Sequence, residues 1–172
     1  KALLAAADPD AFAAELPQVI ADPQGFIDSW LEAGRDLSKE ALLERWTAGL
    51  EALATAIGKV PEGTKIPWYG PPMSPASFAT ARVMEYWAHG QDVVDTLGFR
   101  RPETPRLRHI AHLGVRTRAY GYSQHGLAPP ENDVRVELRA PDGGRWSWGE
   151  PAAEDRVVGS AADFCLVVVQ RR

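Results

Sequence analysis

Apolar residues recur at intervals of three and four through most of the chain, and this spacing predicts a series of helices. Asp8 and Pro9 form a cap and first-turn pair. They open a short helix that we expect to end at Leu16, because Pro17 interrupts the pattern. A second helical stretch follows and ends at Gly34.

The longest apolar stripe follows Ser38, which is placed to cap a helix that Gly58 ends. Its bulky side chains share one helical face, and we expect all of them to be core residues: Leu42, Leu43, Trp46, Leu50, Leu53 and Ile57. Residues 60–73 contain too much proline and glycine for regular structure. They are predicted to form a stiff connecting loop.

Two further helices are predicted from their ends. Ser74 caps the first, and Gly98 ends it about six turns later. Apolar side chains surround most of this helix and it contains no lysine, so we expect it to be buried on most sides. Thr104 and Pro105 repeat the cap signal for a helix that reaches about Gly126.

The pattern changes after residue 129. Apolar and charged residues alternate over 134–138, which predicts a strand, and residues 141–144 have the composition of a turn. Trp146 and Trp148 alternate on the return strand, and residues 157–158 suggest another short strand.

Ser160, with Asp163 three residues later, marks the start of a final helix. The β-branched run at 167–169 leaves a buried strand as the alternative. Together these elements predict an α+β fold that is mainly α: a helical bundle over residues 1–128, followed by a small sheet-containing αβ lobe over 129–172. Helical patterns at 2–7 and 170–172 lead us to expect that both ends of the protein are missing from this chain.

The bulk composition indicates a soluble globular protein. With 172 residues, 45% of them hydrophobic, the chain can bury a sizeable core as one domain or two small ones. The net charge of -4 argues against a nucleic-acid partner. Basic residues are scattered apart from one loose cluster: Arg100, Arg101, Arg106, Arg108, Arg116 and Arg118.

The sequence contains no signal for a membrane or for secretion. No apolar run approaches the length of a membrane span, and nothing resembles a signal peptide. The single cysteine, Cys165, lies in an apolar run, so we interpret it as a core residue rather than a nucleophile. One cysteine suits a reducing cytoplasm, and we expect a cytoplasmic protein of undetermined oligomeric state.

The candidate chemistry lies in the helix that begins after Ser74. Glu85 and His89 are four residues apart and therefore point the same way, while Arg82 and Asp92 extend the stripe at spacings of three. A carboxylate and an imidazole in this arrangement make half of a metal site. If the helix is buried, a divalent metal would offset their desolvation. The alternative is a solvated face of intrahelical ion pairs that binds nothing.

Three other sets of residues have a functional and a structural interpretation. Arg82 either orients Glu85 or holds an anionic substrate, unless it is an ordinary ion-pair partner. Tyr69 and Met73 precede the helix and are candidates for the mouth of a pocket, or else simple loop residues.

Three histidines follow Gly98. His109 and His112 are three apart and form either a metal pair or, more simply, surface or packing residues. His125, beside the helix-ending Gly126, places a favourable charge at a helix C-terminus.

Residues 67–74 (PWYGPPMS) and 81–93 (ARVMEYWAHGQDV) resemble the actinobacterial branch of the mycothiol-dependent maleylpyruvate isomerase family. Segments 134–138, 140–144 and 163–168 are similar to that family as well. The resemblance covers nearly the whole chain and is most specific in the helix that carries Glu85.

The resemblance implies a DinB-like four-helix bundle that binds a metal, usually zinc, and a C-terminal lobe similar to sterol carrier domains. The family's metal takes one histidine from an early helix, then a glutamate and a histidine spaced like Glu85 and His89. No histidine precedes His89 in this chain, so we expect the first ligand upstream of Lys1.

The resulting hypothesis is a metal-dependent thiol transferase or isomerase. The metal would activate a low-molecular-weight thiol, mycothiol by resemblance, for attack on an electrophilic small molecule. A binding module that holds a metal or small ligand without turnover is the alternative.

Overall fold

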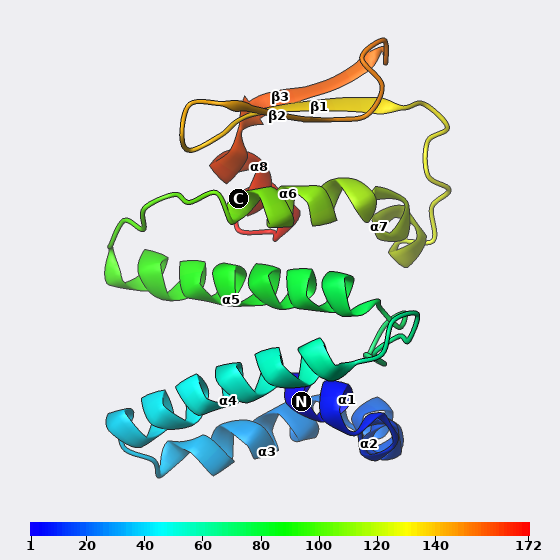
Figure 1. Cartoon of the computed structure of the whole chain (residues 1–172). Helices are drawn as coiled ribbons and strands as arrows, with labels where there is room; N and C mark the ends of the chain where they lie inside the picture. The colour runs from blue at the N-terminus through cyan, green and yellow to red at the C-terminus, as the bar shows by residue number, and fades with distance from the viewer. The chain divides into compact units, whose positions relative to one another are not determined.

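Eight helices and one small three-stranded sheet make up the structure, a computed structural model that describes residues 1–172 (Figure 1). This confirms the predicted α+β, mainly helical fold. Contacts within the chain define two units, Lys1–Ala79 and Thr80–Arg172, each with a hydrophobic cluster of its own. None of the helices combines the length and the apolar character needed to cross a bilayer.

The first unit contains four complete helices and the start of a fifth: α1 (Ala2–Ala7), α2 (Pro9–Ala21), α3 (Pro23–Arg35), α4 (Lys39–Lys59) and α5 (Pro75–Leu97). Aspartates cap two of them, because Asp8 accepts a hydrogen bond from the backbone N–H of Ala11 and Asp22 from that of Gly25. Pro17 lies inside α2, so the predicted end at Leu16 is wrong. A proline removes only one backbone donor and its φ is helical, so α2 continues to the next cap, at Asp22.

Aromatic packing dominates the core of this unit. Phe12, Ile66 and Phe78 are fully buried. Trp68 stacks on Phe12 with 5.6 Å between ring centroids and meets Phe78 edge-on at 5.2 Å. The predicted connecting loop is confirmed as irregular, and one backbone pairing between Ile66 and Met73 closes it.

The expectation that the whole apolar stripe of α4 is core is wrong. Leu53 is buried, whereas Leu42, Leu43 and Trp46 are 43%, 61% and 52% exposed. The buried cluster of the first unit includes only the second half of α4, where the six-residue α1 packs against it. The first half of α4 has no such covering helix within its unit.

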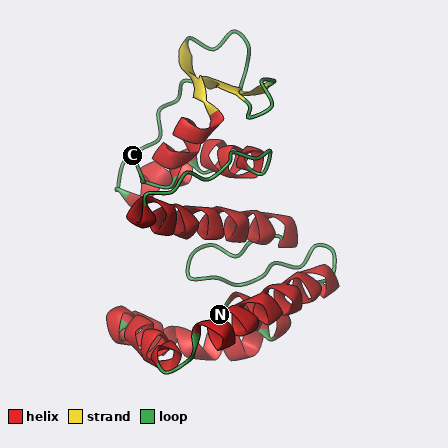
Figure 2. Ribbon diagram, turned by 90° about the vertical axis from the view of Figure 1, so that its left-hand side faces the viewer, coloured by secondary structure: helices red, strands yellow, loops and turns green.

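The second unit contains the rest of α5 and six further elements: α6 (Leu107–Arg116), α7 (Arg118–Gln124), β1 (Val134–Arg139), β2 (Arg145–Trp148), β3 (Asp155–Ser160) and α8 (Ala161–Val168). The strand order is β2-β1-β3, with β1 antiparallel to β2 and parallel to β3. Helices α6 and α8 lie between α5 and the sheet (Figures 1 and 2).

The hydrophobic cluster of this unit combines helices and sheet. Leu107, Ile110, Leu138 and Cys165 are fully buried in it, which confirms Cys165 as a core residue. Burial raises the pKa of the Cys165 thiol to about 12. The predicted division at residue 128 stays a prediction; residues on both sides of that position share this cluster.

The structure tests three predictions about helices in this unit, of which one is confirmed and two are wrong. The helix expected up to Gly126 is two helices that meet at Thr117, whose hydroxyl donates to the carbonyl of Leu113 at 2.9 Å. The final helix is confirmed, because Ser160 accepts a hydrogen bond from the backbone N–H of Asp163. Residues 170–172 are not helical, since Gln170 has a φ of 59°.

A glycine allows α6 and α8 to approach closely. A Cβ atom at Gly114 would lie 2.5 Å from a methyl group of Val168. We therefore expect Gly114→Ala to lower the free energy of unfolding by about 1–3 kcal/mol, measured by urea denaturation. Gly121→Ala is the matched control, because no atom lies within 4 Å of its added Cβ. Equal stability of the two variants would contradict this packing.

Candidate functional site

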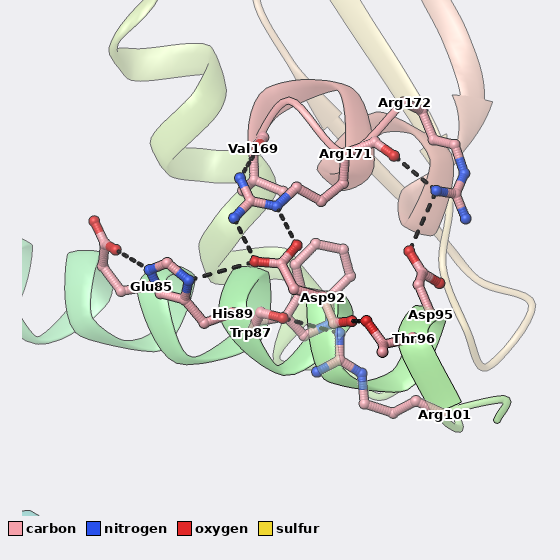
Figure 3. A network of polar contacts seen from close by, with 10 residues as sticks. All are labelled: Glu85, Trp87, His89, Asp92, Asp95, Thr96, Arg101, Val169, Arg171 and Arg172. Carbon is pink, nitrogen blue, oxygen red and sulfur yellow. Dashed lines mark hydrogen bonds and ion pairs between the residues drawn. The ribbon is translucent and has the colours of Figure 1, made fainter. Parts of the chain in front are cut away.

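Helix α5 carries the predicted polar stripe. Ser74 caps it by accepting a hydrogen bond from the backbone N–H of Ser77, and Gly98, with a φ of 68°, follows its last turn. Glu85 and His89 lie on one face, and the Oε2 atom of Glu85 is 3.5 Å from the Nε2 atom of His89 (Figure 3). The structure therefore brings the two predicted metal ligands together.

Asp92 and Arg171 extend this pair into a chain of four groups. The Nδ1 atom of His89 lies 3.4 Å from Oδ2 of Asp92, so a carboxylate faces each ring nitrogen of His89 (Figure 3). Arg171 donates two hydrogen bonds of 2.7 Å to the two oxygens of Asp92. Arg171, together with a smaller effect of His89, holds the pKa of Asp92 below its usual range.

Sequence reasoning did not single out Arg171. It lies 79 positions from Asp92 in the chain, and no periodicity relates the two residues. Its neighbour Arg172 forms a second, looser pair with Asp95 at 3.4 Å. The one sequence feature that could have indicated these pairs is the presence of two adjacent arginines after the last helix and two aspartates three residues apart on α5.

The predicted burial of the stripe is wrong. The side chain of His89 is 71% exposed, and those of Glu85 and Asp92 are 41% and 46% exposed. Helix α5 instead turns Ala88 and Trp87 toward the hydrophobic cluster of the second unit, which leaves the stripe at the surface. Desolvation therefore does not by itself require a metal at this stripe.

Arg82, one turn before Glu85, is half-buried. Burial lowers the pKa of its guanidinium group, while the charges of Glu85 and Tyr86 act in the opposite direction. Arg82 is thus electrostatically coupled to Glu85, and its role toward Glu85 or a substrate stays a prediction.

Tyr69 and Met73, the predicted residues of a pocket mouth, belong to the first unit. The ring of Tyr69 lies 5.2 Å from that of Phe12, and the backbone of Met73 pairs with Ile66. Burial and the charge of Glu15 raise the pKa of Tyr69. Their role at a pocket stays a prediction.

The other histidines do not complete a metal site. Nδ1 of His112 accepts a hydrogen bond from the indole N–H of Trp148 at 3.2 Å. No three His, Cys, Asp or Glu side chains of residues 1–172 gather as a metal-binding group. The first ligand predicted upstream of Lys1 lies outside the described residues.

The two donor atoms of Glu85 and His89 nevertheless fit a shared metal ion. Zinc bonds to nitrogen and oxygen of about 2.0–2.2 Å in tetrahedral geometry place neighbouring donors roughly 3.3–3.5 Å apart. The observed separation of 3.5 Å meets this distance requirement. The second ring nitrogen of His89 faces Asp92, and a carboxylate in this position beside a ligating histidine is common in zinc sites.

Comparison with known proteins assigns the family. Residues 1–94, more than half of the chain, match the profile of the mycothiol maleylpyruvate isomerase N-terminal domain. The chain belongs to this family. The match ends at residue 94 and thus includes both Glu85 and His89, which confirms the resemblance seen in the sequence of this helix.

Two curated relatives come from two strains of Mycobacterium tuberculosis and are described as uncharacterized proteins. Each is 50% identical to the chain over 171 residues, which is 99% of the chain and 66% of the relative. The chain thus spans slightly less than two thirds of the length of these relatives. No solved structure matches the chain significantly.

Proposed function

We propose that the protein uses mycothiol in a metal-dependent reaction with an electrophilic small molecule, as a thiol transferase or isomerase. Membership of the mycothiol maleylpyruvate isomerase N-terminal domain family supports the thiol. The 3.5 Å separation of the Glu85 and His89 donor atoms is the observation that carries the metal dependence. The further ligand predicted upstream of Lys1 is part of the proposal.

The residues of the stripe and Arg171 have distinct tasks in this proposal. Glu85 and His89 would hold zinc through Oε2 and Nε2, and Asp92 would accept a hydrogen bond from the Nδ1–H group of His89, which fixes the ring. Arg171 keeps Asp92 ionised and in place. Arg82 orients the Glu85 carboxylate or pairs with an anionic substrate. When bound, zinc offers a coordination position in which a thiol loses its proton at neutral pH.

The exposure of His89 favours the alternative, in which the stripe forms ion pairs and binds nothing. Metal analysis distinguishes this alternative from a metal site. The purified full-length protein, which includes the segment upstream of Lys1 that is predicted to carry the third ligand, is equilibrated with zinc, dialysed and analysed for metal by mass spectrometry. We expect about one equivalent of zinc, as three protein ligands provide. A content near zero would overturn the metal proposal.

Turnover is tested separately on the same preparation. Mycothiol is mixed with maleylpyruvate or with a chlorodinitrobenzene, and thiol loss and product formation are followed with zinc-loaded and chelator-treated protein. We expect zinc-dependent conversion of at least one electrophile. Bound zinc without any zinc-dependent conversion would identify a binding module rather than an enzyme.

A further inference from the structure

A cleft of about 1050 Å³ lies within the second unit, away from the polar stripe of α5. Its walls come from α6 and α7 on one side and from the sheet and α8 on the other. None of Glu85, His89, Asp92 and Arg171 lines it. Its volume is that of a small-molecule site.

The helical wall of this cleft carries two guanidinium groups and two imidazoles. His112 and Arg116 on α6 are four residues apart, and Arg118, Tyr122 and His125 follow α7 at spacings of four and three, so each group shares a helix face. No aspartate or glutamate occurs between residues 104 and 130. This wall therefore offers positive charge and hydrogen-bond donors without a competing carboxylate of its own.

The opposite wall is largely apolar. Phe164 and Val168 from α8 and Val134 and Val136 from β1 line it, together with the half-buried indole of Trp148. The hydrogen bond of 3.2 Å from Trp148 to His112 holds this ring at the junction of the two walls.

Two carboxylates and one guanidinium group of the sheet side also line the cleft. Asp133 and Asp155 belong to the sheet side, at the starts of β1 and β3. Arg156 is engaged elsewhere, since it donates to the carbonyl of Pro151 at 2.8 Å and lies 3.7 Å from Glu137. The guanidinium group of Arg118 lies 5.7 Å from the ring centroid of Tyr122, and its Nη1 atom donates to the carbonyl of Asn132 at 3.3 Å, which leaves its other N–H groups for a ligand.

We propose that this cleft binds an aromatic carboxylate, with the ring against Trp148 and Phe164 and the carboxylate against Arg116 and Arg118. A ligand that makes apolar contacts with one wall and charge-assisted hydrogen bonds with the other must be an anion with an apolar body. Aromatic side chains on the walls, Tyr122 among them, suit a flat aromatic body better than an aliphatic one. The proposal is independent of the metal proposal.

Isothermal titration calorimetry with 2-naphthoate and its neutral analogue 2-naphthamide tests the proposal on the whole chain. We expect saturable 1:1 binding of 2-naphthoate, with a shift of the Trp148 indole N–H signal in NMR spectra, and at least about tenfold weaker binding of the amide. Equal affinity for acid and amide, or no saturable binding below about 1 mM, would overturn it.

Variants localise the binding. Arg116→Gln should weaken 2-naphthoate about tenfold and leave the amide unchanged. Arg108→Gln is the matched control, because this exposed arginine of α6 does not line the cleft. Gly121→Leu should fill the cleft and lower the affinity for both ligands, since no atom lies within 4 Å of a Cβ at this position.

The same titrations separate the two proposals. His89→Ala should bind 2-naphthoate like the wild type. An unchanged affinity in both Arg116→Gln and Gly121→Leu would place any binding elsewhere.

Discussion

Replacing His89 by alanine is expected to abolish stoichiometric zinc binding, and Glu85→Gln is expected to do the same. The loss of affinity should exceed the roughly 10- to 100-fold typical of changes to outer partners, because each variant removes a proposed direct ligand. Folding should be nearly unaffected, because exposed side chains contribute little to stability. Zinc affinity is measured by competition with a chromogenic chelator, and the free energy of unfolding by urea denaturation.

His109→Ala is the matched control for the loss of an imidazole. His109 lies on α6, is exposed and was the alternative metal residue in the sequence. We expect its affinity for zinc to equal that of the wild type. Loss of zinc in His109→Ala together with retention in His89→Ala would move the site from α5 to α6.

Arg171→Gln is expected to disturb the metal site without touching a ligand. Loss of its two hydrogen bonds frees Asp92, so zinc affinity should fall about tenfold. In the metal-free protein, the pKa of Asp92 should rise toward the ordinary value of about 3.9, as measured by carboxyl NMR titration. Arg172→Gln, which loses a pair with Asp95 instead, should leave both quantities unchanged.

The sign of the pH dependence follows from the direction of this shift. A lowered pKa of Asp92 in the folded state means that the pair with Arg171 stabilises the protein above the unfolded pKa of Asp92. That stabilisation disappears as the pH falls through the folded pKa. Arg171→Gln should therefore make the unfolding free energy less sensitive to pH in this acidic range, and an unchanged acid dependence would contradict the pairing.

Local signals in the sequence predicted most of the secondary structure. Side-chain caps such as Ser38 and Ser160 act within three residues, so their pattern is readable without a tertiary structure. Alternation over β1 likewise located the sheet, and the i, i+4 spacing placed Glu85 beside His89. The cap at Asp22, which carries the same signal, marks the end of α2, whereas Pro17 inside the helix does not.

Predictions that depended on tertiary contacts did less well. The stripe of α4 has the spacing of a core face, yet Leu43 is exposed because the six-residue α1 reaches only the second half of that helix. Helix α5 was predicted to be buried on most sides, including its polar stripe, whereas Glu85 and His89 lie at the surface. Arg171 meets Asp92 only through the packing of α8, which no local pattern encodes.

The missing side chain at Gly114 has a consequence beyond stability. Because α8 rests directly on that glycine, the distance between the two helices also sets where the segment after α8 emerges, and hence how far Arg171 reaches toward Asp92. A methyl group added on α6 would push against Val168, and we expect the resulting shift of α8 to alter the pair between Arg171 and Asp92 beside His89. Packing between α6 and α8 is therefore coupled to the contacts of the polar stripe.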